Sequence, residues 1–224
     1  GWVKRFADLI QENNIRIKYK IQSRVDLLLQ ETNIADLARS GCDNVWVGAE
    51  SGSQKILDAM DKGTKVEQIK EATLLLKKHK IKPAFFLQFG YPGETEEDIK
   101  KTIAMVMELL PDDVGISVSY PLPGTKFYEN VKHELKSKAN WTDSDELALM
   151  FSNTYPSEYY KHLHRYVHKK YRRHQGAEIL KNIFSGNEPV SKQNIKRAAG
   201  ILYHIPGEWH HHRQMKKIAG NGNS

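Results

Sequence analysis

Residues 84–99 read AFFLQFGYPGETEEDI, and this stretch decides the fold. An apolar run ends at Phe89, a Pro-Gly turn follows at residues 92–93, and Thr95 can cap a helix. After Thr95, apolar residues recur at helical spacing, at Ile99, Ile103, Val106, Met107 and Leu110. The stretch therefore predicts a strand, a tight turn and a helix, which together make one βα unit.

The rest of the first half repeats this pattern. Three more short runs of apolar or β-branched residues are typical of strands, at residues 15–22, 45–49 and 115–120. Helical patterns connect the strands, at residues 34–40, 54–60 and 64–76. Thr64 and Glu67 form a capping-box signature at the start of the last of these helices. Strands about one βα unit apart favour a parallel sheet with crossover helices, so we predict an α/β fold of about four βα units.

The charge of the chain is unevenly distributed. Residues 1–125 carry 17 Lys and Arg against 18 Asp and Glu, whereas residues 126–224 carry 17 against 9 and nine of the ten histidines. The net charge of +7 therefore belongs to the second part, and a boundary is expected near the PLPGT turn at 121–125. We predict a near-neutral α/β part followed by a basic, mostly helical part.

The basic part contains an aromatic stripe at helical spacing within residues 156–174, and further helices are predicted at 177–184 and 189–204. Basic residues around an aromatic stripe could bind nucleic acid or lie on anionic lipid, or the helix could simply pack on the rest of the fold. Three adjacent histidines at 210–212 cannot all face one ion in a regular element, so we predict no metal site. The predicted domains are residues 1–135, a helical extension at 136–206 and a tail without fixed structure at 207–224.

Composition excludes several classes of protein. No apolar run approaches the ~20 residues of a membrane-spanning helix, so we predict no membrane span. The first residues lack the apolar stretch of a secretory signal, and Cys42 is the only cysteine. One thiol cannot form an internal disulfide or hold a multi-thiolate metal site, and we expect a cytoplasmic protein.

Polar side chains share one face of the predicted strands, because alternate residues of a strand point to the same side. These residues are Lys18, Lys20, Gln22, Arg24, Gly48, Glu50, Gln88, Ser117 and Ser119. A closed barrel would fill this face with branched apolar residues, so the pattern favours a sheet with helices on one side and a wet cavity on the other. For the first strand alone, a solvated edge strand is the alternative.

Three strand ends carry turns suited to a ligand. The turn GAESGS at 48–53 places Glu50 and Ser51 at a strand tip, although Ser51 or Ser53 could instead cap the next helix. The turn at 89–95 includes Gly90, Pro92, Gly93 and Glu94, and could offer a backbone ledge to a flat ring, although an ordinary βα connection explains it as well. The third exit, SVSYPLPGT at 117–125, includes Ser117, Ser119 and Tyr120.

Segments 48–63, 88–99 and 119–128 resemble, in this order, the later strands of a radical S-adenosylmethionine (radical SAM) domain. The similarity is greatest to the cobalamin-binding group that includes the anaerobic magnesium-protoporphyrin monomethyl ester oxidative cyclases. It covers about residues 1–135. The resemblance implies a partial (β/α)6 TIM-like barrel, of which the four strands here would be the third to the sixth.

The resemblance also implies cofactors and partners. Members of the family bind S-adenosylmethionine and a four-iron four-sulfur cluster held by three cysteines, and they generate a 5′-deoxyadenosyl radical that attacks a small-molecule substrate. For this subgroup, cobalamin, a tetrapyrrole substrate and a reductant such as flavodoxin or ferredoxin are the expected companions. Methylation, cyclisation and methylthiolation of RNA share this scaffold, and the sequence leaves the choice among them open.

Roles are carried over by matching positions. Glu50 and Ser51 resemble residues that hold the ribose or methionine end of S-adenosylmethionine, and Arg24 is placed to meet a carboxylate. For Arg24 a surface ion pair with Asp26 or Glu50 is the alternative. The turn from Gly90 through Pro92 and Gly93 to Glu94 resembles the adenine-binding ledge. The last-strand residues Ser117, Ser119 and Tyr120 resemble groups near adenine or substrate.

One departure from the family is decisive. The three-cysteine cluster loop is absent, and we interpret Cys42 as a packing residue rather than a ligand. The chain is therefore expected to be the C-terminal portion of a longer radical SAM enzyme and to be inactive alone. Two other hypotheses remain from the sequence: a non-catalytic module that binds nucleic acid through its basic tail, and a remnant that binds S-adenosylmethionine without activity.

Overall fold

The computed structural model describes residues 1–30, 32–135, 147, 151, 153–187 and 189–221. The chain forms two compact units, each described by itself below. Unit 1 comprises residues 1–89 and 95–116, and unit 2 comprises residues 90–94 and 117–224. The domain boundary predicted at residue 135 differs from this division, because unit 2 begins at residue 117 and also takes in the turn at 90–94.

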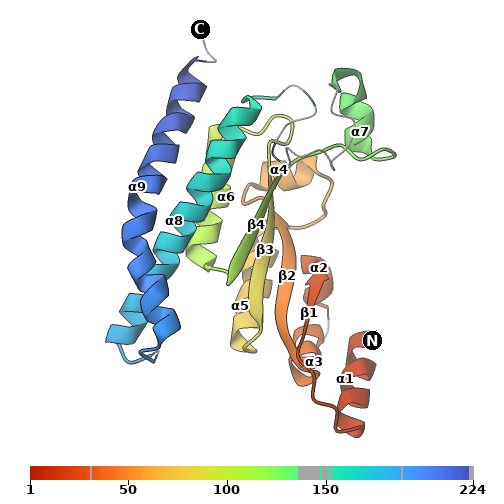
Figure 1. The fold of residues 1–224 in the computed structure, drawn as a ribbon. Helices are drawn as coiled ribbons and strands as arrows, with labels where there is room; N and C mark the ends of the chain where they lie inside the picture. The colour runs from red at the N-terminus through yellow and green to blue at the C-terminus, as the bar shows by residue number, and fades with distance from the viewer. Residues whose placement is uncertain (31, 136–146, 148–150, 152, 188, 222–224) are drawn as a thin grey trace. The chain divides into compact units, whose positions relative to one another are not determined.

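Unit 1 contains most of a four-stranded sheet with the order β1-β2-β3-β4. Its strands are β1 (Tyr19–Ser23), β2 (Cys42–Glu50), β3 (Lys82–Phe89) and β4 (Asp113–Val118). β1 pairs with β2 and β2 with β3 in parallel, and all four arrows point the same way in Figure 1. The predicted parallel α/β architecture is confirmed, with each strand found within four residues of the predicted start.

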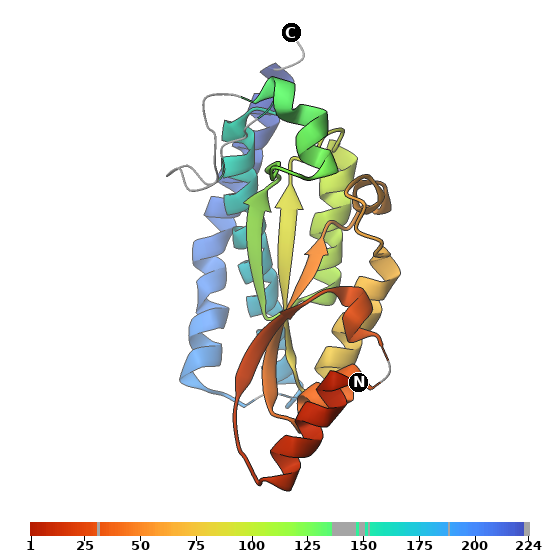
Figure 2. The ribbon, with the colours of Figure 1, turned by 90° about the vertical axis from the view of Figure 1, so that its right-hand side faces the viewer.

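The helices of unit 1 follow the strands in the βα order that the sequence predicted. They are α1 (Trp2–Glu12), α2 (Val25–Leu28), α3 (Asn33–Arg39), α4 (Gln54–Ala59), α5 (Val66–Lys78) and α6 (Glu96–Leu109). On β2, Val45, Val47 and Ala49 are completely buried on one face, whereas Trp46 and Gly48 on the other face are partly exposed. Figure 2 shows α5 and α6 running alongside the strands. The core of unit 1 therefore lies on one side of the sheet.

The sequence signals predicted the cap of α6 correctly and the cap of α5 with an error of one residue. At α6 the backbone N–H of Asp98 donates to Thr95 Oγ1 (3.4 Å), and the Thr95 N–H donates to Asp98 Oδ2 (3.0 Å), which confirms the predicted cap. At α5 the predicted pair of Thr64 and Glu67 is wrong by one residue. The N–H of Lys65 donates to Gln68 Oε1 (2.9 Å) instead, since Thr64 is buried before the helix begins.

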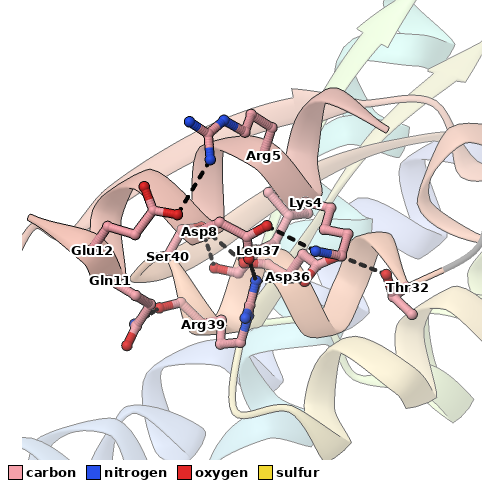
Figure 3. A network of polar contacts seen from close by, with 10 residues as sticks. All are labelled: Lys4, Arg5, Asp8, Gln11, Glu12, Thr32, Asp36, Leu37, Arg39 and Ser40. Carbon is pink, nitrogen blue, oxygen red and sulfur yellow. Dashed lines mark hydrogen bonds and ion pairs between the residues drawn. The ribbon is translucent and has the colours of Figure 1, made fainter.

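Helix α1, which the sequence patterns did not single out, is joined to α3 by the polar network in Figure 3. Asp8 accepts hydrogen bonds from Lys4 (2.8 Å) and Arg39 (2.6 Å), and Arg39 also lies 3.1 Å from Asp36. The pKa of Asp8 is lowered to about 2 by the hydrogen bonds from Lys4 and Arg39. Lys4 and Arg39 are exposed, so solvent screens these ion pairs and weakens their contribution to stability.

Unit 2 consists of helices and connecting segments. They are α7 (Lys126–Val131), the 3-10 turn η1 (Lys132–Glu134), α8 (Ser157–Phe184) and α9 (Lys192–Asn221). α8 and α9 run antiparallel to each other (Figure 1). α8 is one continuous helix where the sequence predicted two, because Gly176 lies within it against the carbonyl oxygen of Arg197 and continues the helix.

The sequence predicted a tail without fixed structure at 207–224. This prediction is wrong for residues 207–221, which belong to α9. The residues that fix this part of α9 have partners on α8. Glu208 pairs with Arg173, and Met215 is buried. Because the Glu208 contact is made with a residue 35 positions earlier, the local Gly- and Asn-rich composition did not reveal it.

Candidate functional site

Glu50 ends β2 in a strained conformation. Its φ is +57°, in the left-handed region that a residue with a side chain rarely adopts, and the register of β2 against β3 shifts between Gly48 and Glu50. A bulge of this kind re-aims a side chain, and such bulges are frequent next to active sites. The Glu50 carboxylate, 13% exposed, accepts a hydrogen bond from Lys62 Nζ at 3.0 Å. A strained, nearly buried carboxylate thus stands where the sequence predicted a ligand-binding one.

Ser51, the neighbouring predicted ligand, is used to shape the turn. Its hydroxyl is buried, lies 3.1 Å from Thr102 Oγ1 and accepts a bond from the N–H of Ser53 (3.1 Å). Gly52 leaves no room for a side chain, because a Cβ there would lie 2.6 Å from the carbonyl oxygen of Lys101. Ser53 occupies the N-cap of α4 as the alternative proposed, but its hydroxyl donates elsewhere, to Asp98.

Asp98 is a buried carboxylate that sequence reasoning treated only as part of a helix. It accepts hydrogen bonds from Ser53 Oγ (2.6 Å), Thr95 Oγ1 (2.7 Å) and Lys55 Nζ (3.0 Å). Burial alone would raise the pKa of this carboxyl, but these hydrogen bonds outweigh burial and hold the pKa well below its usual range. Asp98 therefore stays charged and ties the turn after β2 to the start of α6.

Arg24, the cap residue of α2, points to its own neighbour. Arg24 Nε and Nη2 donate to the two carboxylate oxygens of Asp26 at 2.9 and 3.0 Å, and the Arg24 side chain is 65% exposed. This is the surface ion pair that the sequence left open as the alternative to a ligand contact. The exposed guanidinium holds the pKa of Asp26 below its usual value.

The partly exposed face of the sheet combines polar and aromatic residues. The rings of Trp46 on β2 and Phe86 on β3 stack with centroids 4.7 Å apart. Gly115 on β4 lies against them, since a Cβ there would be 3.2 Å from the Trp46 ring. Gln88 is partly exposed on the same face as Phe86. The predicted polar face is therefore correct toward the carboxyl ends of the strands, but an aromatic platform occupies its middle.

In unit 2, the predicted ledge is a turn closed by its own glutamate. Glu94 is completely buried, and its Oε2 accepts a hydrogen bond from the N–H of Gly90 at 2.6 Å. Two residues that the sequence did not single out hold the turn from outside. Asn153 Nδ2 donates to the carbonyl oxygen of Gly90, and Thr154 Oγ1 donates to that of Glu94 (3.0 Å).

The tip of this turn is open. Pro92 and Gly93 are exposed, and Gly93 has a φ of +78° that favours glycine. The turn can therefore offer its tip to a flat ligand, while the backbone groups of Gly90 are already bonded within unit 2.

Two buried hydroxyls of unit 2 have no hydrogen-bond partner among the described residues, those of Ser119 and Tyr160. Burial, and next the charge of Glu94, raise the pKa of Tyr160 well above its usual range, so it stays a neutral donor. The predicted residue Ser119 is thus an orphaned buried group of the kind that a ligand could satisfy. Its neighbour Tyr120 is exposed, and Ser117 is the last residue but one of β4. The aromatic spacing of α8 had indicated only packing for Tyr160.

Cys42 is buried at the start of β2, with its Sγ 3.5 Å from the carbonyl oxygen of Asn44. Burial raises the pKa of the Cys42 thiol to about 11, so it stays protonated at neutral pH. A thiol of this kind is a poor metal ligand, in agreement with a packing role. Within the described part of the chain, no group of three or more His, Cys, Asp or Glu could hold a metal ion, and no helix could span a membrane.

These features define an α/β domain with parallel strands, one of which ends in a carboxylate on a strained backbone. The sequence profile of the Radical SAM superfamily matches residues 3–106. This segment of the chain is therefore similar to the radical SAM superfamily, in agreement with the predicted resemblance.

Three relatives illustrate the range of the match. A bacteriochlorophyllide d C-12(1)-methyltransferase of Chlorobaculum tepidum is 30% identical over 66% of this chain and 33% of its own length. A tRNA-2-methylthio-N(6)-dimethylallyladenosine synthase of Trichlorobacter lovleyi is 32% identical over 50% of this chain and 26% of its own. An anaerobic magnesium-protoporphyrin IX monomethyl ester cyclase of Rubrivivax gelatinosus is 27% identical over 57% of this chain and 24% of its own.

Among solved structures, the cobalamin-dependent S-adenosylmethionine radical enzyme OxsB with aqua-cobalamin bound superposes with a TM-score of 0.54 at 17% identity. The superposition covers 92% of this chain and 36% of OxsB, and it confirms the predicted fold class. The chain spans a quarter to a third of the length of the three relatives described above.

Proposed function

We propose that this chain forms part of a radical SAM enzyme in which Glu50, at the end of β2, binds S-adenosylmethionine. The observation that carries the proposal is the backbone of Glu50. A non-glycine residue in the left-handed region costs about 1 to 3 kcal/mol, and such strain is concentrated at functional sites. Its φ of +57° at a bulge aims a carboxylate at the strand end, where α/β folds place their ligands.

The Glu50 carboxylate suits the hydroxyl or ammonium donors of S-adenosylmethionine, and binding would require Lys62 to share or release it. In unit 2, the Ser119 hydroxyl and the exposed tip of the turn at Pro92 and Gly93 suit a nucleoside. When bound and reduced, the cofactor supplies a 5′-deoxyadenosyl radical in this family. We propose that the Glu50 carboxylate binds and orients it.

The four-iron four-sulfur cluster does not fit the residues of this chain. Three thiolates are needed, and the chain has the single protonated thiol of Cys42. We propose that the cluster ligands, and the cobalamin-binding residues if cobalamin is used, lie outside these 224 residues. The chain alone would then not abstract hydrogen. The reductant and the cytoplasmic location stay predictions.

For the substrate we propose a planar, largely apolar small molecule, of which a tetrapyrrole is one example. The stacked rings of Trp46 and Phe86, with Gly115 beside them, form an aromatic cluster on the partly exposed face of the sheet. A flat apolar molecule stacks well on such a platform. Two of the relatives named above have bacteriochlorophyllide or magnesium-protoporphyrin in their names, which agrees with this class.

The proposal is tested by Glu50→Gln in the complete protein that contains this chain, with its cluster reconstituted anaerobically. Glu50→Gln keeps the size of the side chain and removes the charge, so affinity for S-adenosylmethionine in equilibrium dialysis should fall about tenfold. The matched control is Glu67→Gln, an exposed position on α5. If both variants bind S-adenosylmethionine with equal affinity, Glu50 does not bind the cofactor.

A further inference from the structure

The outer side of α9 carries a continuous apolar stripe. Its members are spaced alternately four and three residues apart, which keeps them on one side of a helix. We call these residues the α9 stripe: Ile195, Ala199, Leu202, Pro206 and Trp209. All five are exposed, with Leu202 at 79% and Trp209 at 63%. Single exposed apolar residues are common, but a contiguous exposed stripe marks an interaction surface.

The stripe is distinct from the face of α9 that packs on α8. That inner face buries Met215 and approaches Gly176 so closely that a Cβ on the glycine would lie 2.9 Å from Ile201. α9 therefore has two apolar sides, of which packing against α8 explains one. The outer side is still to be accounted for.

Both ends of the stripe are basic. Lys192 precedes it, Lys196 directly follows its first residue, and Arg213, Lys216 and Lys217 follow its last. The guanidinium of Arg213 lies 5.4 Å from the ring centroid of Trp209, and Lys169 of α8 lies 3.7 Å from that of Tyr203. The one acidic residue of α9, Glu208, is paired with Arg173. The stripe is thus framed by positive charge with no unbalanced negative charge on its helix.

We propose that the α9 stripe docks on the surface of an anionic lipid bilayer, with α9 lying in the plane of the headgroups. Trp and aliphatic side chains enter the boundary between headgroups and acyl chains, while flanking Lys and Arg reach anionic headgroups. The α9 stripe has this composition. This inference concerns a surface of α9 and does not depend on the proposed binding of S-adenosylmethionine.

Two other occupants fit the stripe less well. Nucleic acid would use the basic residues and the Trp209 ring, but it offers no apolar surface for Ile195 and Leu202. A second copy of the chain would bring basic helix ends against each other in either orientation, and Pro206 interrupts the seam that a coiled coil needs. Charge and aliphatic content together favour an anionic bilayer.

Co-sedimentation with vesicles tests the proposal, using the full 224-residue chain and vesicles of phosphatidylcholine with or without phosphatidylglycerol. We expect binding to the vesicles that contain phosphatidylglycerol, and about tenfold weaker binding for Leu202→Ser and for Trp209→Ser. Leu74→Ser on α5 is the matched control, since Leu74 is a comparably exposed leucine (54%) outside the stripe. Arg213→Gln should weaken binding at low salt more than at high salt.

Circular dichroism of each variant verifies that α8 and α9 are still folded. The proposal is overturned if the wild-type chain stays in the supernatant with anionic vesicles, or if Leu202→Ser binds them as well as Leu74→Ser does. It is also overturned if single-stranded RNA competes the chain off the vesicles and Leu202→Ser weakens RNA binding as much as vesicle binding. Dimerisation that Leu202→Ser abolishes would assign the stripe to a second copy instead.

Discussion

Glu50 and Ser51, at the end of β2, have different roles in the turn that follows the strand. Ser51 is fully engaged with Thr102 and Ser53, so it determines the shape of the turn. Glu50 adds strain to the same turn, although glycine would fit its φ without cost. A strained residue persists when the surrounding structure or a function requires it. Substitution by glycine distinguishes these two reasons.

We expect Glu50→Gly to leave the free energy of unfolding unchanged or to raise it by up to about 2 kcal/mol. Relief of the left-handed backbone is a gain of about 1 to 2 kcal/mol, and loss of the partly exposed pair with Lys62 offsets up to about 1 kcal/mol. Asp61, with a φ of +56° in an exposed turn, is the matched position. Asp61→Gly should stabilise the chain in urea titration. A loss of more than about 1 kcal/mol in Glu50→Gly alone would show that Glu50 is structural.

At the scale of elements, α8 and α9 meet where histidines face each other. His162 Nδ1 and His211 Nδ1 are 2.9 Å apart, and Glu158, Arg165, Lys169 and His210 are the charged or titratable groups around them. Burial, and then the neighbouring His162, lower the pKa of His211 to about 4, and burial also lowers the pKa of His162. The folded pair is therefore neutral at pH 7.

This pair makes the helical hairpin sensitive to acid. Because the unfolded chain binds the proton of a histidine at about pH 6.5 and folded His211 only near pH 4, stability is complete above pH 6.5 and declines as the pH falls toward 4. We expect a loss of roughly 1 kcal/mol between pH 7.5 and pH 5, after allowance for solvent screening. His211→Gln should flatten this dependence in thermal unfolding, whereas the 70% exposed His133, changed to Gln, should not. Equal pH slopes in all three proteins would contradict the interpretation.

The crossing of α8 and α9 depends on Gly176. A Cβ on Gly176 would lie 2.9 Å from the carbonyl oxygen of Arg197, which is backbone and cannot move aside. Gly176→Ala should therefore lower the free energy of unfolding by about 1 to 3 kcal/mol despite the better helix propensity of alanine. At Gly207 the nearest atoms are the flexible Lys169 side chain at 3.1 Å, so Gly207→Ala should be neutral or stabilising. Urea titration of both variants tests this, and equal effects would contradict the close approach.

At the scale of the whole molecule, the sequence predicted what local signals encode. The segment from Phe85 to Ile99 could be assigned in detail because strand, turn and helix cap are all written in neighbouring residues. The helical state of residues 207–221 could not, since it depends on partners in α8. The same reason explains which residues of the candidate site could be predicted and which could not. Glu50 stood out at its turn, whereas Asn153 and Tyr160 reach the turn at 90–94 from about sixty residues away.

This distance has a consequence for any shortened chain. A domain ending at residue 135 would keep the turn at 90–94 but lose Asn153, Thr154 and Tyr160, which bond to it or bury it. Glu94 would then be exposed to water, and so would the hydrogen bond that it accepts from the N–H of Gly90. We expect hydrogen exchange in peptides covering residues 87–95 to become at least about tenfold faster in a 1–135 chain than in the complete one.

Two further variants show which contacts protect the turn at 90–94 from exchange. Asn153→Ala in the complete chain removes only one of the bonds to the turn, so exchange in the same peptides should be intermediate. A chain ending at residue 187 lacks α9 but keeps Asn153, Thr154 and Tyr160, so its peptides should exchange as slowly as those of the complete chain. If the 1–135 chain protects the turn equally well, the turn is stabilised locally by the Glu94 bond to Gly90, and the boundary predicted from the sequence would describe an independent domain after all.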